Sequence, residues 1–326
     1  MSDGIVLAVD GGNSKTDLAL VRGDGTVLAL VRGPQSSPQH LGVDGALDVI
    51  ELLLEQATAE AGLDGSRPIA DVGQLLLAGL DFEDEEAEVL QAATDRGWAR
   101  VISVGNDTFA VLRAGTERGW GVAVVCGAGI NCVGVAPDGR HARFLALGAI
   151  TGDWGGGYDV GLAAVSAAAR SEDGRGAKTS LERLVPAHFG LATPRELAEA
   201  IYRGHLEQRR VVELAPVVFE AAEDDAVAAG IVDRLATEIA TMARTAIERL
   251  DLGREPVEVL LGGGLVRSGN GRLVDAVAAA LGEGPLVRAT PVPPIAGAAL
   301  LGLDRLGAGV EAQARLRKEM EEVRVG

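Results

Sequence analysis

One pattern of short apolar runs and glycine turns occurs twice in this chain, and it constrains the fold more than any other feature. In each copy, three apolar runs are separated by a glycine turn and then by an Asp-Gly turn. The runs are Ile5–Val9, Leu18–Val21 and Val27–Val31 in the first copy and Gly121–Cys126, Asn131–Ala136 and Arg143–Leu147 in the second. β-Branched runs bounded by such turns predict strands, so each copy predicts a three-stranded meander. The recurrence predicts two related domains that face one another.

Strand and helix patterns alternate after each meander. Strands are expected at 72–77, 101–104, 257–261 and around 287, and helices at 44–62, 84–97, 106–114, 159–170, 265–281, 296–306 and 310–323. The segment 179–250 is helical in pattern, and the polar segment 32–41, which contains prolines, is predicted to be a loop. This alternation predicts an α/β fold with mixed sheets.

The two copies suggest domain boundaries. We expect a first domain at 1–115, with the C-terminal helix 308–326 as a candidate addition, and a second domain at 116–307 with a helical insertion at about 159–250. The C-terminal helix is expected to pack through its apolar side chains Val310, Leu316 and Met320.

Composition excludes several classes of partner. The formal net charge of −17 argues against binding to nucleic acid or to an anionic membrane surface, and aromatic residues are only 3% of the chain. The N-terminus lacks the pattern of a signal peptide, and no apolar run approaches the length of a membrane span. Two cysteines indicate no disulfide framework. We therefore expect a cytoplasmic protein.

Polar or glycine-rich turns stand where predicted strands end. They are Asp10–Thr16, Gly127–Gly129, Gly152–Gly157 and Gly262–Gly264, with Asp107 as a fifth position. Glycines let a backbone approach a ligand, Ser14 and Lys15 can contact phosphate, and the Asp10 carboxylate suits hydrated Mg²⁺. The sequence contains no Walker A motif, and no GxGxxG turn precedes a predicted helix. Asp107 could bind a ligand at a strand end, or Asn106 or Asp107 could simply cap the next helix.

These motifs, in this order, resemble those of the BadF/BadG ATPase and N-acetylglucosamine kinase family, within the actin/hexokinase/Hsp70 superfamily. The resemblance rests on Asp10–Thr16, Asn106-Asp107, Gly127–Asn131, Gly152-Asp153 and Gly262–Gly264, and it covers essentially the whole chain. It implies two ribonuclease H-like domains around an interdomain cleft. It also implies use of ATP and Mg²⁺, a small-molecule sugar substrate and a homodimer.

The resemblance further implies roles for individual residues. Asp10 would lie near Mg²⁺, through water, and Asp107 would take the proton of the attacking sugar hydroxyl. The implied phosphate contacts are Gly11, Gly12, Asn13, Ser14, Lys15 and Thr16 in a first loop and Gly127, Ala128 and Gly129 in a second. Gly262, Gly263 and Gly264 would lie under the adenosine. The implied sugar contacts, besides Asp107, are Asp153, Ser37, Gln39, His40 and Asn131.

The implied activity is phosphorylation of an amino sugar, N-acetylglucosamine or glucosamine, at the 6-position. Three positions differ from the family pattern. Ala128 replaces a hydroxyl residue, Trp154 replaces an acidic residue, and Ser36-Ser37-Pro38 stands where family kinases carry an asparagine.

Two other functions remain open from the sequence. A sensor could bind nucleotide and sugar without turnover. An ATPase activator, the other branch of the family, would hold a [4Fe–4S] cluster with cysteines of two subunits. Cys126 and Cys132 are separated by five residues, and Cys126 falls in a predicted buried strand, so buried free thiols are the favoured interpretation.

Overall fold

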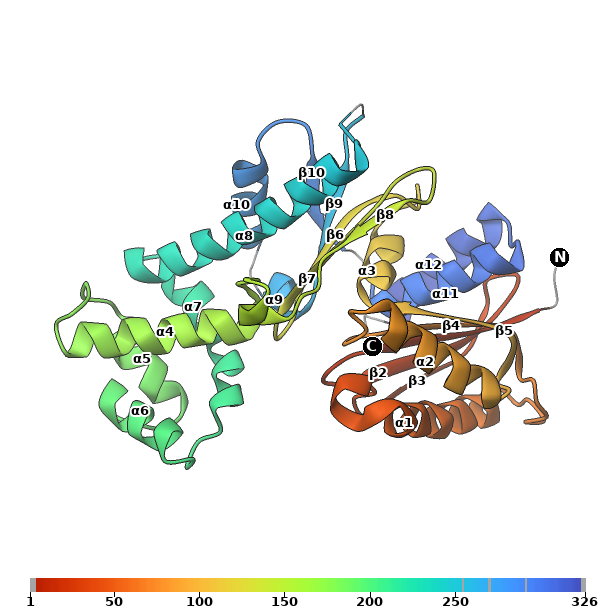
Figure 1. Ribbon diagram of the computed structural model, residues 1–326, viewed down its shortest axis with the longest axis horizontal. Helices are drawn as coiled ribbons and strands as arrows, with labels where there is room; N and C mark the ends of the chain where they lie inside the picture. Colours follow the sequence, from red (N-terminus) through yellow and green to blue (C-terminus); the bar gives the residue numbers. More distant parts are fainter. Residues whose placement is uncertain (1–3, 254, 269–270, 291, 324–326) are drawn as a thin grey trace. The chain divides into compact units, whose positions relative to one another are not determined.

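The computed structural model describes residues 4–253, 255–268, 271–290 and 292–323 (Figure 1). The chain forms two compact units, of which unit 1 comprises Met1–Trp120 with Thr290–Gly326 and unit 2 comprises Gly121–Ala289. In the part of the chain that the structure describes, no helix is long and apolar enough to cross a membrane.

Unit 1 is built on a five-stranded mixed sheet with the strand order β3-β2-β1-β4-β5. Its strands are β1 (Ile5–Gly11), β2 (Thr16–Arg22), β3 (Val27–Gly33), β4 (Ala70–Leu77) and β5 (Ala99–Asn106). The first three form the predicted antiparallel meander, whereas β4 and β5 run parallel to β1. The carboxyl ends of β1, β4 and β5 therefore meet at one edge of the sheet.

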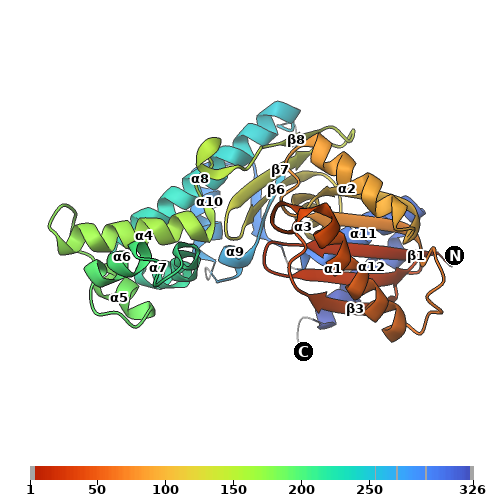
Figure 2. The ribbon, with the colours of Figure 1, turned by 60° about the horizontal axis from the view of Figure 1, so that its bottom comes forward.

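Helices cover both faces of this sheet, as Figure 2 shows. The helices are α1 (Pro38–Glu60) and α2 (Glu83–Asp95) on one face, and α3 (Thr108–Gly115), α11 (Pro294–Leu306) and α12 (Val310–Val323) on the other. Along β1, Leu7 and Val9 face the first group, while Val6 and Ala8 face the second. This burial on both faces explains why the strand reads as a continuous apolar run rather than an alternating one.

Helix α11 corrects the expected domain boundary. We expected residues up to 307 in the second domain, but α11 belongs to unit 1 and packs on its sheet. The physical reason is the row of small residues in this helix. A Cβ on Gly297 would lie 1.8 Å from the Ala110 carbonyl oxygen, and one on Gly302 would lie 2.2 Å from Val6 Cγ1. Glycine alone permits these close contacts with α3 and β1.

Unit 2 repeats the topology of unit 1, with the strand order β10-β9-β6-β7-β8. Its strands are β6 (Gly121–Cys126), β7 (Ile130–Val135), β8 (His141–Arg143), β9 (Glu258–Gly262) and β10 (Leu286–Ala289). The meander β6-β7-β8 is antiparallel, and β9 and β10 run parallel to β6. The repeat predicted from the sequence is confirmed, although β8 ends at Arg143 instead of continuing to Leu147.

The helices of unit 2 lie mainly between β8 and β9. They are α4 (Gly156–Glu172), α5 (Leu181–His188), α6 (Pro194–Tyr202), α7 (Ala215–Ala221), α8 (Ala226–Leu250), α9 (Gly264–Ser268), α10 (Arg272–Leu281) and the 3₁₀ turns Gly148–Ile150 and Gln208–Leu214. The predicted stripe of α8 is confirmed, because Ile231, Leu235, Ile239, Met242 and Ala246 are all buried. The single helix expected up to Leu281 is instead divided into α9 and α10.

Candidate functional site

The carboxyl edge of the unit 1 sheet brings two aspartates onto neighbouring strand ends. Gly11 pairs with Leu77, and Leu77 pairs with Asn106, so β1, β4 and β5 end at the same level. The Ala78 amide donates to the Gly11 carbonyl oxygen over 2.7 Å and extends this alignment by one residue. Asp10 and Asp107 therefore leave strands that are separated only by β4, about 10 Å apart across the sheet.

The capping interaction at the start of α3 comes from Asn106 rather than from Asp107. Asn106 Oδ1 accepts from the Thr108 amide at 3.1 Å and from Thr108 Oγ1 at 2.7 Å, while Nδ2 donates to the Leu80 carbonyl. The Asp107 carboxylate makes no capping hydrogen bond and is half-buried. Of the two alternatives left open by the sequence, the structural role thus falls to the asparagine.

The first glycine turn, between β1 and β2, presents an exposed tip. Its ends are joined by a 2.9 Å hydrogen bond from the Gly12 amide to the Lys15 carbonyl, and Asn13 and Ser14 are exposed. A Cβ on Gly11 would lie 2.4 Å from both Leu77 Cδ2 and Ser36 Oγ. Only a glycine lets this turn sit so close to β4, and the tip is consequently held at the strand-end edge.

An ion-pair cluster lies directly behind this turn. The Asp17 carboxylate forms ion pairs with Lys15 Nζ at 2.8 Å and with Arg32 Nε at 2.6 Å. Burial alone would raise the pKa of Asp17, but the hydrogen bonds from Arg32 and Lys15 outweigh it and hold that pKa below its ordinary value. Asp17 in turn raises the pKa of Arg32. Sequence analysis missed Arg32, which shows its role only once β3 is paired with β2.

Two of the residues with implied ligand contacts, Thr16 and Ser37, are buried and make internal hydrogen bonds. Thr16 Oγ1 donates to Ser36 Oγ over 2.7 Å, and Ser37 Oγ donates to the Ala78 carbonyl over 3.1 Å. All three side chains are wholly buried. In this structure the hydroxyls of Thr16 and Ser37 are therefore engaged in internal hydrogen bonds.

The segment after Ser37 is helical, which corrects the expected loop at 32–41. Helix α1 begins at Pro38, because proline is well suited to a first helical turn, and it is interrupted at Gly42, where φ is +70°. Gln39 and His40 are exposed in the first turn. A Cβ on Gly79, just past β4, would lie 2.9 Å from Gln39 Cβ. The turn after β4 thereby brings Gln39 to the strand-end edge.

Unit 2 carries the second glycine turn at the corresponding place, between β6 and β7. The turn Gly127–Gly129 is supported by α4, whose Gly157 and Tyr158 amides donate to the Gly127 and Ala128 carbonyls at 2.8 and 2.9 Å. Gly156 has φ +74°, and a Cβ there would lie 2.4 Å from the Gly129 backbone. Around Gly127 and Gly129 themselves, the space for a Cβ is open.

The third glycine turn packs against the same place. Gly262 pairs with Val125, and Gly263, with φ +95°, would place a Cβ 2.1 Å from the Cys126 carbonyl oxygen. The exposed Gly264 begins α9. Unit 2 therefore gathers Gly127–Gly129, Gly155–Gly157 and Gly262–Gly264, three segments far apart in sequence, around one strand end.

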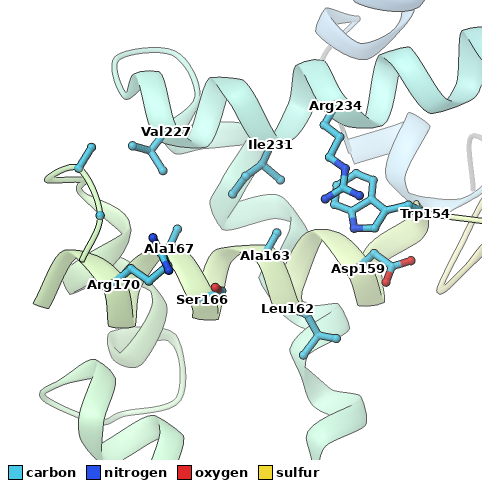
Figure 3. A pocket seen from close by; sticks show the side chains of 12 residues that line it. Trp154, Asp159, Leu162, Ala163, Ser166, Ala167, Arg170, Val227, Ile231 and Arg234 are labelled. Atoms are coloured by element: carbon cyan, nitrogen blue, oxygen red, sulfur yellow. The ribbon is translucent and has the colours of Figure 1, made fainter. Parts of the chain in front are cut away.

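Asp153 and Trp154 lie in the connection that leads into α4. Asp153 and Trp154 are half-buried, and the Asp153 carboxylate accepts a hydrogen bond from Oγ1 of the exposed Thr151. Asn131, at the start of β7, is half-buried and accepts from the Cys132 amide at 2.7 Å. Trp154 lines one end of a cavity of about 480 Å³ between α4 and α8 (Figure 3). The Arg234 guanidinium lies 3.9 Å above the Trp154 ring.

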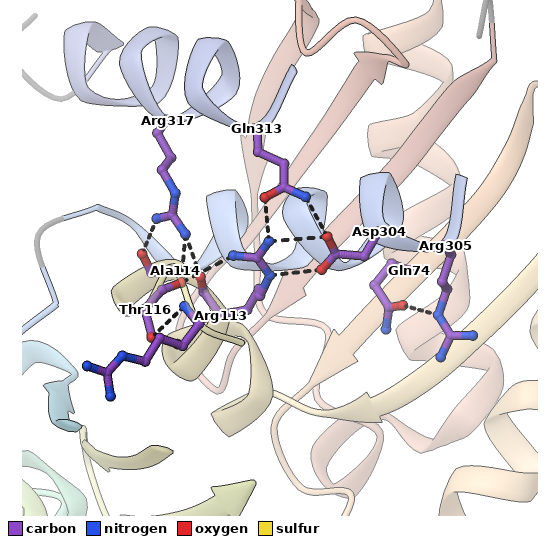
Figure 4. Close-up of polar contacts among 9 residues, drawn as sticks. Gln74, Arg113, Ala114, Thr116, Asp304, Arg305, Gln313 and Arg317 are labelled. Atoms are coloured by element: carbon purple, nitrogen blue, oxygen red, sulfur yellow. Dashed lines mark hydrogen bonds and ion pairs between the residues drawn. The ribbon is translucent and has the colours of Figure 1, made fainter. Parts of the chain in front are cut away.

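Helix α3, which begins beside Asp107, is held at its other end by the C-terminal helices (Figure 4). Arg317 of α12 donates to the Ala114 and Thr116 carbonyls at 2.6 and 2.8 Å, and Arg113 pairs with Asp304 of α11. Cations suit the carbonyl end of a helix. Leu316 and Met320 are buried as expected, but Val310 is 79% exposed, so its expected packing is wrong.

The cysteines have the properties of structural thiols. Cys126 and Cys132 are buried, and burial raises the pKa of Cys126 to about 12 and that of Cys132 further. Such thiols are protonated near neutral pH and present no thiolate surface for a shared cluster. Within the described residues, no three His, Cys, Asp or Glu side chains form a metal-binding group.

Comparison with known proteins identifies the family to which this chain belongs. A family model described as the BadF/BadG/BcrA/BcrD ATPase family matches residues 7–302. The chain belongs to this family. The resemblance noted in the sequence is thus confirmed, and members of a family of ATPases use ATP.

Individual relatives have names that refer to sugars. The chain is 28% identical over 268 residues to an N-acetylmuramic acid/N-acetylglucosamine kinase of Clostridium acetobutylicum, covering 81% of this chain and 86% of that protein. It is 27% identical over 280 residues to an N-acetyl-D-glucosamine kinase of Dictyostelium discoideum, covering 82% and 88%. The crystal structure of a presumed N-acetylglucosamine kinase from Chromobacterium violaceum matches with a TM-score of 0.73 and 25% identity, covering 92% and 99%. The expected α/β fold with two mixed sheets is confirmed.

Proposed function

We propose that the protein transfers a phosphoryl group from ATP to a hydroxyl of an amino sugar, with Asp107 as the general base. The observation that carries this proposal is the division of roles at the end of β5. Asn106 makes the capping contacts of α3, and a carboxylate stands next to it at the strand-end edge. Ligands of α/β sheets bind at such edges, and phosphoryl transfer requires a group that orients the attacking hydroxyl.

The residues of each unit fit ATP in a different way. In unit 1, the exposed tip Asn13-Ser14 and the partly exposed Lys15 suit phosphate oxygens. In unit 2, the open space at Gly127 and Gly129 lets a phosphate approach the backbone, and the exposed Gly264 beside this turn suits the adenosine. Bound ATP would supply the phosphoryl group and its leaving group.

A magnesium ion fits the carboxyl edge of the unit 1 sheet, where a single carboxylate, that of Asp10, would hold it. Asp10 is half-buried at the end of β1, and among the described residues no cluster of three acidic, histidine or cysteine side chains competes with it. Mg²⁺ at a nucleotide usually keeps several waters and takes one or two carboxylates besides the phosphates. We therefore assign the ion to Asp10, through water, and to the phosphates.

For the acceptor, we propose N-acetylglucosamine, glucosamine or N-acetylmuramic acid, phosphorylated at the 6-hydroxyl. The names of the two curated relatives support this class. In unit 1, Asp107 is the proposed base for the attacking hydroxyl and Gln39 a proposed sugar contact. In unit 2, the proposed sugar contacts are Asp153 and Asn131. Short carboxylates and amides suit a sugar because hydroxyls both donate and accept hydrogen bonds.

The test is release of ADP by the purified protein with a panel of sugars. The panel contains glucosamine, N-acetylglucosamine, N-acetylmuramic acid, N-acetylmannosamine and glucose, and the position of the phosphate is read by NMR. We expect release that depends on an amino sugar and on Mg²⁺. Binding of ATP and sugar without release would instead support the sensor, and release indifferent to every sugar would support an ATPase.

A further inference from the structure

The cavity between α4 and α8 begins at the residue that follows the proposed sugar contact Asp153. It has a volume of about 480 Å³ and lies wholly within unit 2. Adjacent Cα atoms are about 3.8 Å apart, so the end of the cavity that Trp154 lines, here called its mouth, begins one residue from Asp153.

Arg234 places a positive charge at this mouth. Figure 3 shows its side chain descending from α8 onto the Trp154 ring, with the guanidinium carbon 3.9 Å from the ring centroid. This stack is the contact that the structure records for the guanidinium; within the described residues, no hydrogen bond or ion pair engages it. Stacking fixes the plane of the group and leaves its five N–H donors at the edge.

The other charged groups of the cavity have partners of their own. Asp159 accepts a 3.0 Å hydrogen bond from the Gly155 amide, which fixes the loop before α4. Arg170, at the far end, donates to the Arg175 carbonyl at 2.9 Å. The wall between them is mostly apolar and includes Leu162 and Ala163, with the Ser166 hydroxyl as its polar group. The mouth thus combines a guanidinium with adjacent methyl groups, which suits a small acid that carries both a carboxylate and an apolar carbon.

We propose that Arg234, held by Trp154, is a specificity residue that binds a carboxylate on the sugar substrate, and that the cavity receives this substituent. This inference rests on the proposed function, because it uses Asp153 as the sugar contact. A guanidinium binds a carboxylate through two parallel charge-assisted hydrogen bonds. The matching substrate class is an amino sugar with a short acidic ether. N-Acetylmuramic acid, which is N-acetylglucosamine with a lactyl ether, is its simplest probe.

The experiment compares kcat/KM for N-acetylmuramic acid and N-acetylglucosamine in the wild type and in Arg234→Gln. We expect the ratio of the two values to fall roughly 10- to 100-fold in the variant, mainly through KM for the acidic sugar, since a hydrogen bond to a charged group has about this effect. Arg234→Lys should recover part of the ratio. The control Arg244→Gln removes an arginine of the same helix outside the cavity, where it donates to the Ala280 carbonyl, and should keep the ratio within about twofold.

A neutral substrate analogue isolates the charge. The wild type should bind the amide of the lactyl group more weakly than the acid by the same factor. Arg234→Gln should bind the acid and the amide with equal affinity. An unchanged ratio in Arg234→Gln, or an equal preference of the wild type for acid and amide, would overturn the inference.

Calorimetric binding of both sugars separates this inference from the proposed function. If the wild type binds the acidic sugar in an Arg234-dependent manner but phosphorylates no sugar, the inference stands and the kinase proposal fails. If the wild type phosphorylates N-acetylglucosamine but does not bind the acidic sugar, the kinase proposal stands and the inference is overturned. Binding of neither sugar would overturn both.

Discussion

The turn between β1 and β2 and the turn between β6 and β7 occupy the same place in two copies of one topology, yet their chemistry is opposite. The first carries an ion-pair cluster around Asp17 and lies on the sheet edge that also presents Asp10 and Asp107. The second, Gly127–Gly129, has no charged side chain and is held by backbone hydrogen bonds from α4. We propose that this shared framework supports two ways of binding an anion, one through charged groups and one through close backbone approach.

The strongest test of this contrast is removal of the proposed base of unit 1, Asp107. Asp107→Asn should lower kcat about 10²- to 10⁴-fold, the usual effect of a positioned base, and should leave ATP and sugar binding nearly intact. Turnover is measured by ADP release and binding by calorimetry. The control Asp138→Asn changes an exposed turn aspartate of unit 2 and should retain turnover within about twofold. Loss of sugar affinity with normal residual turnover would contradict the role.

In unit 2, the corresponding test acts on the backbone. Gly156→Ala places a Cβ 2.4 Å from the Gly129 backbone at φ +74°, and should lower the free energy of unfolding by about 2–4 kcal/mol. It should also weaken ATP binding, because the turn would be displaced. Denaturant unfolding and calorimetry measure the two effects. As a control, Gly230→Ala, at a helical site with open space, should stabilise by up to about 1 kcal/mol. Unchanged ATP affinity in a destabilised Gly156→Ala protein would contradict the proposal that the position of the Gly127–Gly129 turn determines ATP binding.

The ion-pair cluster predicts a pH dependence of stability in unit 1. The pKa of Asp17 is lowered in the folded protein, so its contribution is fully present above the ordinary carboxyl pKa of about 3.9. This contribution is lost as the pH falls through the lower folded value. Asp17→Asn should cost about 1–3 kcal/mol at pH 7 and should flatten the loss of stability on acidification.

Urea titrations from pH 7 to pH 3 would measure this effect. Asp24→Asn, which removes a partly exposed ion pair with Arg315, is the matched control and should cost less than about 1 kcal/mol. Equal costs for the two variants would show that the ion pairs of the buried Asp17 contribute no more to stability than an ordinary surface pair.

The smallest expected effect comes from making the second turn more like the first. Ala128→Ser adds a hydroxyl to the exposed centre of the Gly127–Gly129 turn, where one further hydrogen bond to phosphate could form. We expect ATP affinity to rise about two- to tenfold, which corresponds to about 0.5–1.5 kcal/mol. Calorimetric titration with ATP provides the measurement, and Ser14→Ala in unit 1 should change affinity in the opposite direction. A weaker affinity in Ala128→Ser would argue that the turn binds through its backbone alone.

Much of the framework could be predicted from the sequence because it depends on local patterns. The two meanders, the parallel strands and the apolar stripe of α8 follow from apolar periodicity and turn residues. The position of α11 could not, because its small residues reveal their purpose only against Ala110 and Val6. The start of α1 at Pro38 was missed because a serine and proline pair is as typical of loops as of helix starts.

The candidate site likewise contains residues that the sequence predicts and residues that only the structure reveals. The glycine turns and Asp107 carry a local signal, and the structure places them at strand ends as expected. Thr16 and Ser37 have side chains suited to ligands, but burial commits them to Ser36 and Ala78, which only tertiary contacts disclose. Arg32 and Arg234 gave no signal in the sequence, because each acts through a partner on another segment.

The most direct test of the central claim follows the γ-phosphate of ATP. ATP labelled in that group is incubated with N-acetylglucosamine and with N-acetylmuramic acid, and the products of the wild type and of Asp107→Asn are separated. The account predicts that the label appears in a sugar phosphate, one for each ADP released, and that Asp107→Asn slows this transfer without weakening sugar binding. Label found only as inorganic phosphate, at a rate that no sugar changes, would contradict it.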